Sequence, residues 1–282
     1  MSRSRLPARL AATTLLALAA ACSDDAAGPA APTGTNATAV NRDVASASGA
    51  AVASDVAVWA GSEAAVSAAF GPAGAPATGT CTRDGNTTRC TDGREGTLNV
   101  ARTVTFFDAA GATQAQYDAA TTARIDIAVL VRGTTSGPQF TSTINRGRSL
   151  SITGLAGAET QRTWNGTGTA TVQSRFTGDL GTRDHRMVEN DTTTNVVWIV
   201  APSRSPYPAS GTIVRNVAVT TTFTGERSGT FSAHRRVLIT FNGTAQVPMQ
   251  VEAVGRRGNT VVLTCQLDLS TRTVACNDRA TS

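Results

Sequence analysis

The sequence predicts an all-β protein built on a large antiparallel meander sheet, curved or closed to a barrel, with one short N-terminal helix. Threonine occurs 45 times in the 282 residues, and apolar residues alternate with it beyond residue 76. Threonine and the other β-branched residues favour strands. No long stretch beyond residue 76 has the 3.6-residue apolar period of a helix. Aromatic residues make up only 5% of the chain, which predicts a thin aliphatic core.

The first 21 residues have the pattern of an export signal. Arginines at positions 3, 5 and 9 precede an apolar run over residues 10–21, which is too short to span a bilayer. Small residues at positions 19–21 lead directly into Cys22. This pattern resembles the lipobox of bacterial lipoproteins, which implies lipidation of Cys22 and anchoring to a membrane. The alternative is ordinary cleavage after Ala21, which would release a soluble protein.

The residue after the candidate lipidation site indicates a destination. Ser23 follows Cys22, and in enterobacterial lipoproteins this pattern favours the outer membrane. The resemblance therefore implies an exported protein of the cell envelope, anchored to the outer membrane by lipid.

The chain has five cysteines, and four of them can form two disulfides between residues close in the sequence. A two-residue loop at positions 85 and 86 would place Cys81 opposite Cys90, and a loop at positions 270 and 271 would place Cys265 opposite Cys276. Directly opposed residues of a hairpin lie about 5.5 Å apart at Cα, within disulfide range. Cys22 is then left for lipid, and the alternative is a free or intermolecular thiol there.

The charged residues exclude several kinds of chemistry. Loss of the three signal arginines lowers the formal net charge from +5 to about +2, so a nucleic-acid partner is not expected. All 25 basic residues are arginine. Without lysine, Schiff-base catalysis, the Ser-x-x-Lys motif and a phosphate-loop lysine are excluded.

Three segments are expected along the chain. Residues 1–21 form the signal peptide, and residues 22–54 form the lipid anchor and a disordered linker, because they are mostly Ala, Gly, Pro, Thr, Ser and Asp. Residues 55–282 form a single β-rich domain. Some 30 linker residues would hold this domain roughly 30 Å from the lipid.

One helix is expected at the start of the domain. Ser62 is a suitable N-cap, Val66 and Phe70 are four residues apart, and Gly-Pro at positions 71 and 72 ends the segment. This short helix should pack Trp59, Val66 and Phe70 against the sheet.

Alternating apolar residues predict about ten strands. Pro248 fits only an edge or bulge position, and residues 177–191 are polar enough to suggest a loop. The predicted strands cover residues 98–106, 125–131, 140–152, 164–176, 196–200, 213–223, 237–251 as one strand interrupted at Asn242-Gly243, and 261–265 leading into a closing hairpin.

One candidate for a chemical site is a polar cluster of Asp184, His185, Glu189 and Asp191. Carboxylates and an imidazole can form a metal site or an acid/base centre. The competing interpretation is a solvated hairpin loop, which the lack of ligand spacing favours. Two histidines exclude a three-His zinc site, and neither His-Glu-x-x-His nor Gly-x-Ser-x-Gly occurs. No metal or cofactor is therefore expected, although a triad assembled from distant residues stays open.

Paired arginines are a second candidate feature. Such pairs suit an anionic polysaccharide or a lipid headgroup. The competing interpretation places them at turns and sheet edges, where they prevent pairing with another chain. The pairs are Arg146 and Arg148, Arg183 and Arg186, Arg235 and Arg236, and Arg256 and Arg257.

These features together predict a lipid-anchored binding or structural module of the cell envelope without catalytic activity. The alternative function is a half-barrel carrier of lipid or another apolar ligand, and a third is a hydrolase centred on His185. The expected partners are the membrane, through the N-terminal lipid, and an envelope polysaccharide, lipid or protein. The mature domain resembles only β-rich envelope lipoproteins without an assigned function.

Overall fold

The computed structural model describes residues 34–69, 79–95, 97–157, 159–178, 181–200, 205–225, 228–254 and 260–277. Within these ranges the chain forms one helix and one antiparallel sheet of 13 strands. The elements are α1 (Gly34–Ala69), β1 (Gly79–Asp84), β2 (Thr87–Glu95), β3 (Leu98–Asp108), β4 (Thr113–Gln114), β5 (Thr122–Gly137), β6 (Phe140–Thr153), β7 (Gln161–Gly178), β8 (Gly181–Ile199), β9 (Ser210–Thr224), β10 (Gly229–Thr240), β11 (Gln246–Val254), β12 (Thr260–Asp268) and β13 (Thr273–Cys276).

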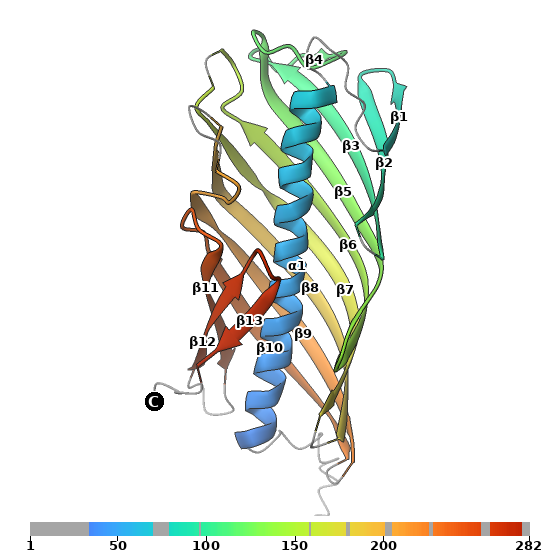
Figure 1. Cartoon of the computed structure of the whole chain (residues 1–282), viewed down its shortest axis with the longest axis vertical. Coiled ribbons are helices and arrows are strands. Elements are labelled where there is room, and N and C mark those ends of the chain that lie inside the picture. Colours follow the sequence, from blue (N-terminus) through green and yellow to red (C-terminus); the bar gives the residue numbers. More distant parts are fainter. Residues whose placement is uncertain are drawn as a thin grey trace, which may run out of the picture.

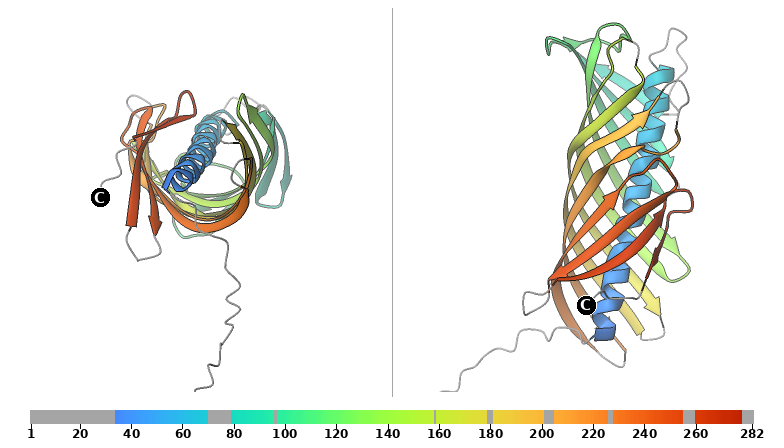
Figure 2. Two further views of the ribbon diagram at one scale, coloured as in Figure 1. Left: turned by 90° about the horizontal axis from the view of Figure 1, so that it is seen from below. Right: turned by 90° about the vertical axis from the view of Figure 1, so that its left-hand side faces the viewer.

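The sheet is a meander that curves around the helix. Its strands follow one another in chain order from β1 to β13, except that the short β4 pairs only with β3. The sheet is not closed, and β1 and β13 are its edges. Figures 1 and 2 show α1 lying along the inside of the curve. The predicted fold class is therefore confirmed in its curved, open form.

Strand alternation separates the two faces of the sheet. Val100 pairs with Val131 and Val104 with Ile127 between β3 and β5, and these four side chains are buried on the concave face. The neighbouring positions in the same strands are more exposed and carry many hydroxyl and charged groups. The concave face and α1 therefore form one core.

The helix is much longer than expected and begins earlier. It runs from Gly34 to Ala69, so the prediction of a disordered linker is wrong from Gly34 onward, while residues 22–33 lie outside the described residues. Alanine favours helices strongly. Buried valines spaced by four or eight residues give the helix a core-facing side, and they are Val40, Val44, Val52 and Val56.

Small side chains let the helix lie close to the C-terminal strands. A Cβ atom at Gly49 would collide with the side chain of Val274 in β13. Trp59 packs on the sheet as expected. Its ring stacks on that of Trp164 in β7, with the two ring centroids 5.5 Å apart. Phe70 and the side chain of Val66 lie outside the described residues. In the part of the chain that the structure describes, no helix is both long and apolar enough to cross a membrane.

Two strand predictions are wrong. Residues 177–191, predicted as a loop, belong mostly to a strand. Strand β8 begins at Gly181 and pairs with β7, starting with Gly181 opposite Gly178. The predicted long strand over residues 237–251 is the hairpin of β10 and β11, in which Ile239 pairs with Met249. A wide turn with Gly243 at φ 81° joins them, and this spacing keeps odd-numbered residues inward on both strands.

Both predicted disulfides are present. Cys81 pairs with Cys90 between β1 and β2, and Cys265 pairs with Cys276 between β12 and β13, in the registers expected from the sequence. Each closes a hairpin at one edge of the sheet. Cys22 lies outside the described residues.

Candidate functional site

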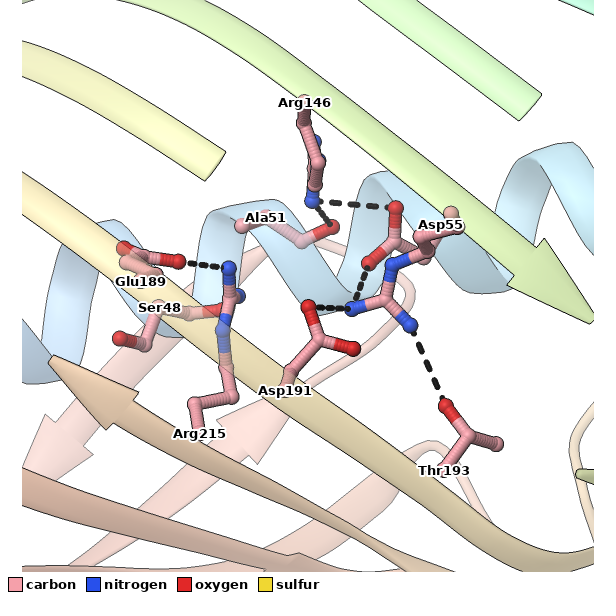
Figure 3. Close-up of polar contacts among 9 residues, drawn as sticks. Ser48, Ala51, Asp55, Arg146, Glu189, Asp191, Thr193 and Arg215 are labelled. Carbon is pink, nitrogen blue, oxygen red and sulfur yellow. Dashed lines mark hydrogen bonds and ion pairs between the residues drawn. The ribbon is translucent and has the colours of Figure 1, made fainter. Parts of the chain in front are cut away.

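Six charged side chains lie between α1 and the concave face of the sheet (Figure 3). We call them the arginine–carboxylate network. Each of these side chains is at most 3% exposed, and three positive charges balance three negative ones. The network consists of Asp55 from α1, Arg146 and Arg148 from β6, Glu189 and Asp191 from β8, and Arg215 from β9.

Ion pairs connect the helix to the centre of the sheet. The Asp55 carboxylate lies 3.0 Å from Arg146 Nη1 and 2.9 Å from Arg148 Nη2. Arg148 Nη2 also lies 3.1 Å from Asp191 Oδ2, and Arg215 pairs with Glu189. One helix carboxylate is therefore shared by two arginines of the same strand.

Arginines also donate hydrogen bonds to the backbone of the helix. Arg146 Nη1 donates to the carbonyl oxygen of Ala51 at 2.7 Å, and Arg215 Nη1 donates to that of Ser48 at 3.0 Å. Long arginine side chains thus span the space between α1 and strands β6 and β9. They fix the position of the helix along the trough.

Burial makes these charges costly unless they stay paired. Desolvation raises the pKa of Asp191, although Arg148 and Arg215 oppose this shift. Desolvation also lowers the pKa of Arg146, against the attraction of Asp55. Removing one partner of a buried ion pair costs about 3–5 kcal/mol. Because a substrate cannot reach side chains this deeply buried, the network is suited to holding α1 in place.

His185 lies on β8 and points into the same core. Its Nδ1 is 2.8 Å from Thr221 Oγ1, and its Nε2 is 3.0 Å from Asp43 Oδ2 on α1. Arg183 donates to the same Asp43 carboxylate through Nε at 2.5 Å and Nη2 at 3.2 Å. The expectation of a solvated loop around His185 is therefore wrong.

The order hydroxyl, imidazole and carboxylate in this group is that of a catalytic triad. Its environment differs from that of a catalytic triad in two ways. The residue Thr221 is 0% exposed, so an acyl group cannot approach its hydroxyl. The Asp43 carboxylate also accepts hydrogen bonds from the Arg183 guanidinium, so it is not dedicated to the imidazole. The geometry thus joins α1 to β8 and β9.

Strand alternation divides the polar cluster predicted from the sequence. Asp184 faces the outer surface and pairs with Arg175, whose hydrogen bond lowers the pKa of Asp184. His185, Glu189 and Asp191 face inward but contact different partners. Among the described residues, no group of three or more His, Cys, Asp or Glu side chains is placed to hold a metal ion.

The arginine pairs are not mainly turn or edge residues. Arg146 and Arg148 are both buried, since they share the inward parity of Leu150 on β6. Residues 256–257 lie outside the described residues. In the other two pairs the first arginine faces inward and the second is more exposed, namely Arg183 with Arg186 and Arg235 with Arg236.

A cavity of about 390 Å³ opens beside the N-terminal half of α1. We call it the α1 cavity. The β5–β6 hairpin and β7 form one wall of this cavity, and the β12–β13 turn forms the opposite wall. The helix α1 lies between these walls. Its floor is formed by buried residues, whereas its rim carries exposed ones. The floor includes Ala51, Ser142, Ile144, Val172 and Ser174, and the rim includes Gln139, Thr177, Arg272 and Thr273.

Polar groups of the α1 cavity are concentrated at two places. On the floor, the hydroxyls of Ser142 and Ser174 lie 2.7 Å apart and hydrogen-bond to each other. At one side, Asp43 and Arg183 form their ion pair. The convex face of the sheet carries shallower depressions, such as one over Ala101, Ala128 and Gly147. Among the cavities lined by described residues, the α1 cavity is therefore the one best suited to enclose a small molecule.

No family model, no curated protein and no solved structure matches this chain.

Proposed function

We propose that this protein is an exported, lipid-anchored and non-catalytic binding module of the cell envelope, and that the α1 cavity is its binding site. The observation that carries the proposal is the cavity itself. Its volume of about 390 Å³ lies in the range of small-molecule sites, about 300–1,000 Å³. A buried floor with an exposed rim gives a ligand one direction of entry.

The position of α1 supports a small ligand over a large lipid. A half-barrel carrier of lipids needs an empty apolar trough. Here α1 and the arginine–carboxylate network occupy the trough, and the network places six charges where lipid chains would lie. The remaining space beside the helix suits one small molecule.

The burial of the titratable groups supports a non-catalytic role. Asp43 lines the α1 cavity, but its carboxylate is already bound by Arg183 and His185. Ser142 and Ser174 pair with each other, and both ring nitrogens of His185 have other partners. A serine nucleophile needs an adjacent base to be activated. A hydrolase centred on His185 is therefore the weaker proposal.

The location rests on the N-terminal pattern and on the cysteines. Stable disulfides between neighbouring strands are typical of exported proteins, and two are present at the edges of the sheet. They leave Cys22 for the lipid. We place the protein at the outer membrane, with the membrane as its partner through this lipid.

Native mass spectrometry of the protein extracted from the envelope tests the binding function. We expect one small molecule per chain, and we expect Ala50→Phe to abolish it, since Ala50 lines the cavity and is half-buried. Ala57→Phe is the matched control, because Ala57 is also a half-buried alanine of α1 but does not line the cavity. An empty chain, or a ligand that Ala50→Phe retains, would refute the proposal.

A further inference from the structure

We propose that the ligand of the α1 cavity is a single-chain anionic amphiphile of medium length, such as a fatty acid of 10 to 12 carbons. This inference rests on the proposed binding function and assigns a ligand class to the same site. It follows from the apolar floor, the charge at the rim and the volume of the cavity.

The inner part of the cavity suits an alkyl chain. Ala51 from α1, Ile144 from β6 and Val172 from β7 are buried residues of its floor. The stacked rings of Phe140 and Phe176, with centroids 6.0 Å apart, form part of its wall. The two serine hydroxyls on the floor hydrogen-bond to each other, which lowers the cost of covering them with an alkyl chain.

The charged residues of the cavity favour an anionic head. Arg183 and Arg272 both line it, whereas Asp43 is the single carboxylate among its lining residues. Two guanidinium groups therefore face the cavity against one carboxylate. Arg272 is exposed on the β12–β13 turn, so its guanidinium is suited to meet a carboxylate at the surface. A carboxylate pairs favourably with guanidinium groups, and an uncharged head does not.

The volume limits the ligand to one chain. If each non-hydrogen atom takes about 30 Å³, as a water molecule does in the liquid, then 390 Å³ holds roughly 13 such atoms. Decanoate and dodecanoate have about this size, whereas a lipid with two long chains exceeds it. The chain-length dependence of affinity is therefore a direct readout of the site.

Isothermal titration calorimetry with fatty acids of 8 to 16 carbons tests the ligand class. The Cys22→Ser variant is used, so that no acyl chain of the protein itself competes. We expect affinity to rise about fourfold per methylene up to 10–12 carbons and then to level off. Decanol should bind at least tenfold more weakly than decanoate. Arg272→Gln should weaken decanoate binding. The control variant Arg186→Gln should leave it unchanged, because Arg186 is an exposed residue of β8 that does not line the cavity.

Two results would overturn the ligand class and leave the binding function intact. Decanol binding as tightly as decanoate, with both lost in Ala50→Phe, would show a cavity that does not select an anion. The absence of binding by any fatty acid, together with another small molecule seen by native mass spectrometry, would show a different ligand class. The absence of both would overturn the binding function as well.

Discussion

Replacement of Asp55 by asparagine should destabilise the fold strongly. Asp55 is the only residue of α1 in the arginine–carboxylate network, and it pairs with both Arg146 and Arg148 at 3.0 and 2.9 Å. The asparagine side chain would keep the shape of the aspartate but leave one uncompensated positive charge in the core. Breaking a buried pair in this way costs about 3–5 kcal/mol. That is a large part of a typical domain stability of about 5–15 kcal/mol.

Urea unfolding followed by circular dichroism measures this loss. The matched control is Asp184→Asn, because Asp184 also pairs with an arginine but lies on the outer face, with 38% of its side chain exposed. Surface pairs contribute about 0–1 kcal/mol. We therefore expect a clear difference in the free energy of unfolding between the two variants.

A double variant separates loss of charge from loss of fold. Asp55→Leu combined with Arg146→Met removes one charge of each sign and leaves two balanced pairs, Arg148 with Asp191 and Arg215 with Glu189. We expect this variant to recover most of the stability lost in Asp55→Leu alone. A loss below about 1 kcal/mol in Asp55→Asn, equal to that of the surface control, would refute the burial of this network.

The remaining predictions concern other parts of the chain. His185→Ala should lower the free energy of unfolding by about 1–3 kcal/mol, since it removes the imidazole that bonds to buried Thr221 and one of the two side-chain partners of Asp43, which keeps Arg183; urea unfolding indistinguishable from wild type would contradict this. The hydrogen bond from the Ser270 hydroxyl and nearby donors lower the pKa of Asp268 to about 2, so its contribution to stability should be present above pH about 4 and be lost as the pH falls towards 2. In Asp268→Asn, the midpoint temperature of thermal unfolding should therefore depend less on pH in this window than in the wild type. An unchanged pH dependence of the midpoint would contradict this prediction. Cys22→Ser should move the protein from the membrane to the soluble fraction, and an intact mass without lipid on the wild-type protein would refute the anchor.

The sheet and its disulfides could be predicted because their signals are local. Alternation sets which face each residue of a strand occupies, and Cys81 and Cys90 lie at symmetric positions about a turn of positions 85 and 86. The parity of Val100 and Val131 was likewise visible in the sequence. Such features need no knowledge of what covers the sheet.

The helix and the network could not be predicted because they depend on each other across the chain. Asp55 directly follows the stretch of small residues that looks like a linker, and its partners are about 90 residues away. The inward charges of His185, Glu189 and Asp191 made β8 look like a loop. One signal was available, since Arg146 and Arg148 share the parity of the apolar residues of β6. Arginines at core positions of a strand indicate carboxylates on the element that covers it.

Hydrogen exchange with and without decanoate tests the central claim that α1 fills the trough and forms one wall of a ligand site. We expect slow exchange over the buried part of α1, residues 40–59, in the free protein. Decanoate should add protection at two places that line the α1 cavity and leave β2 unchanged. These places are Ser46, Ala47, Ala50 and Ala51 on α1 and residues 272–274 at the β12–β13 turn. Exchange of residues 40–59 at the rate of an unfolded chain, or added protection confined to the convex face, would contradict this position of α1 and of the ligand.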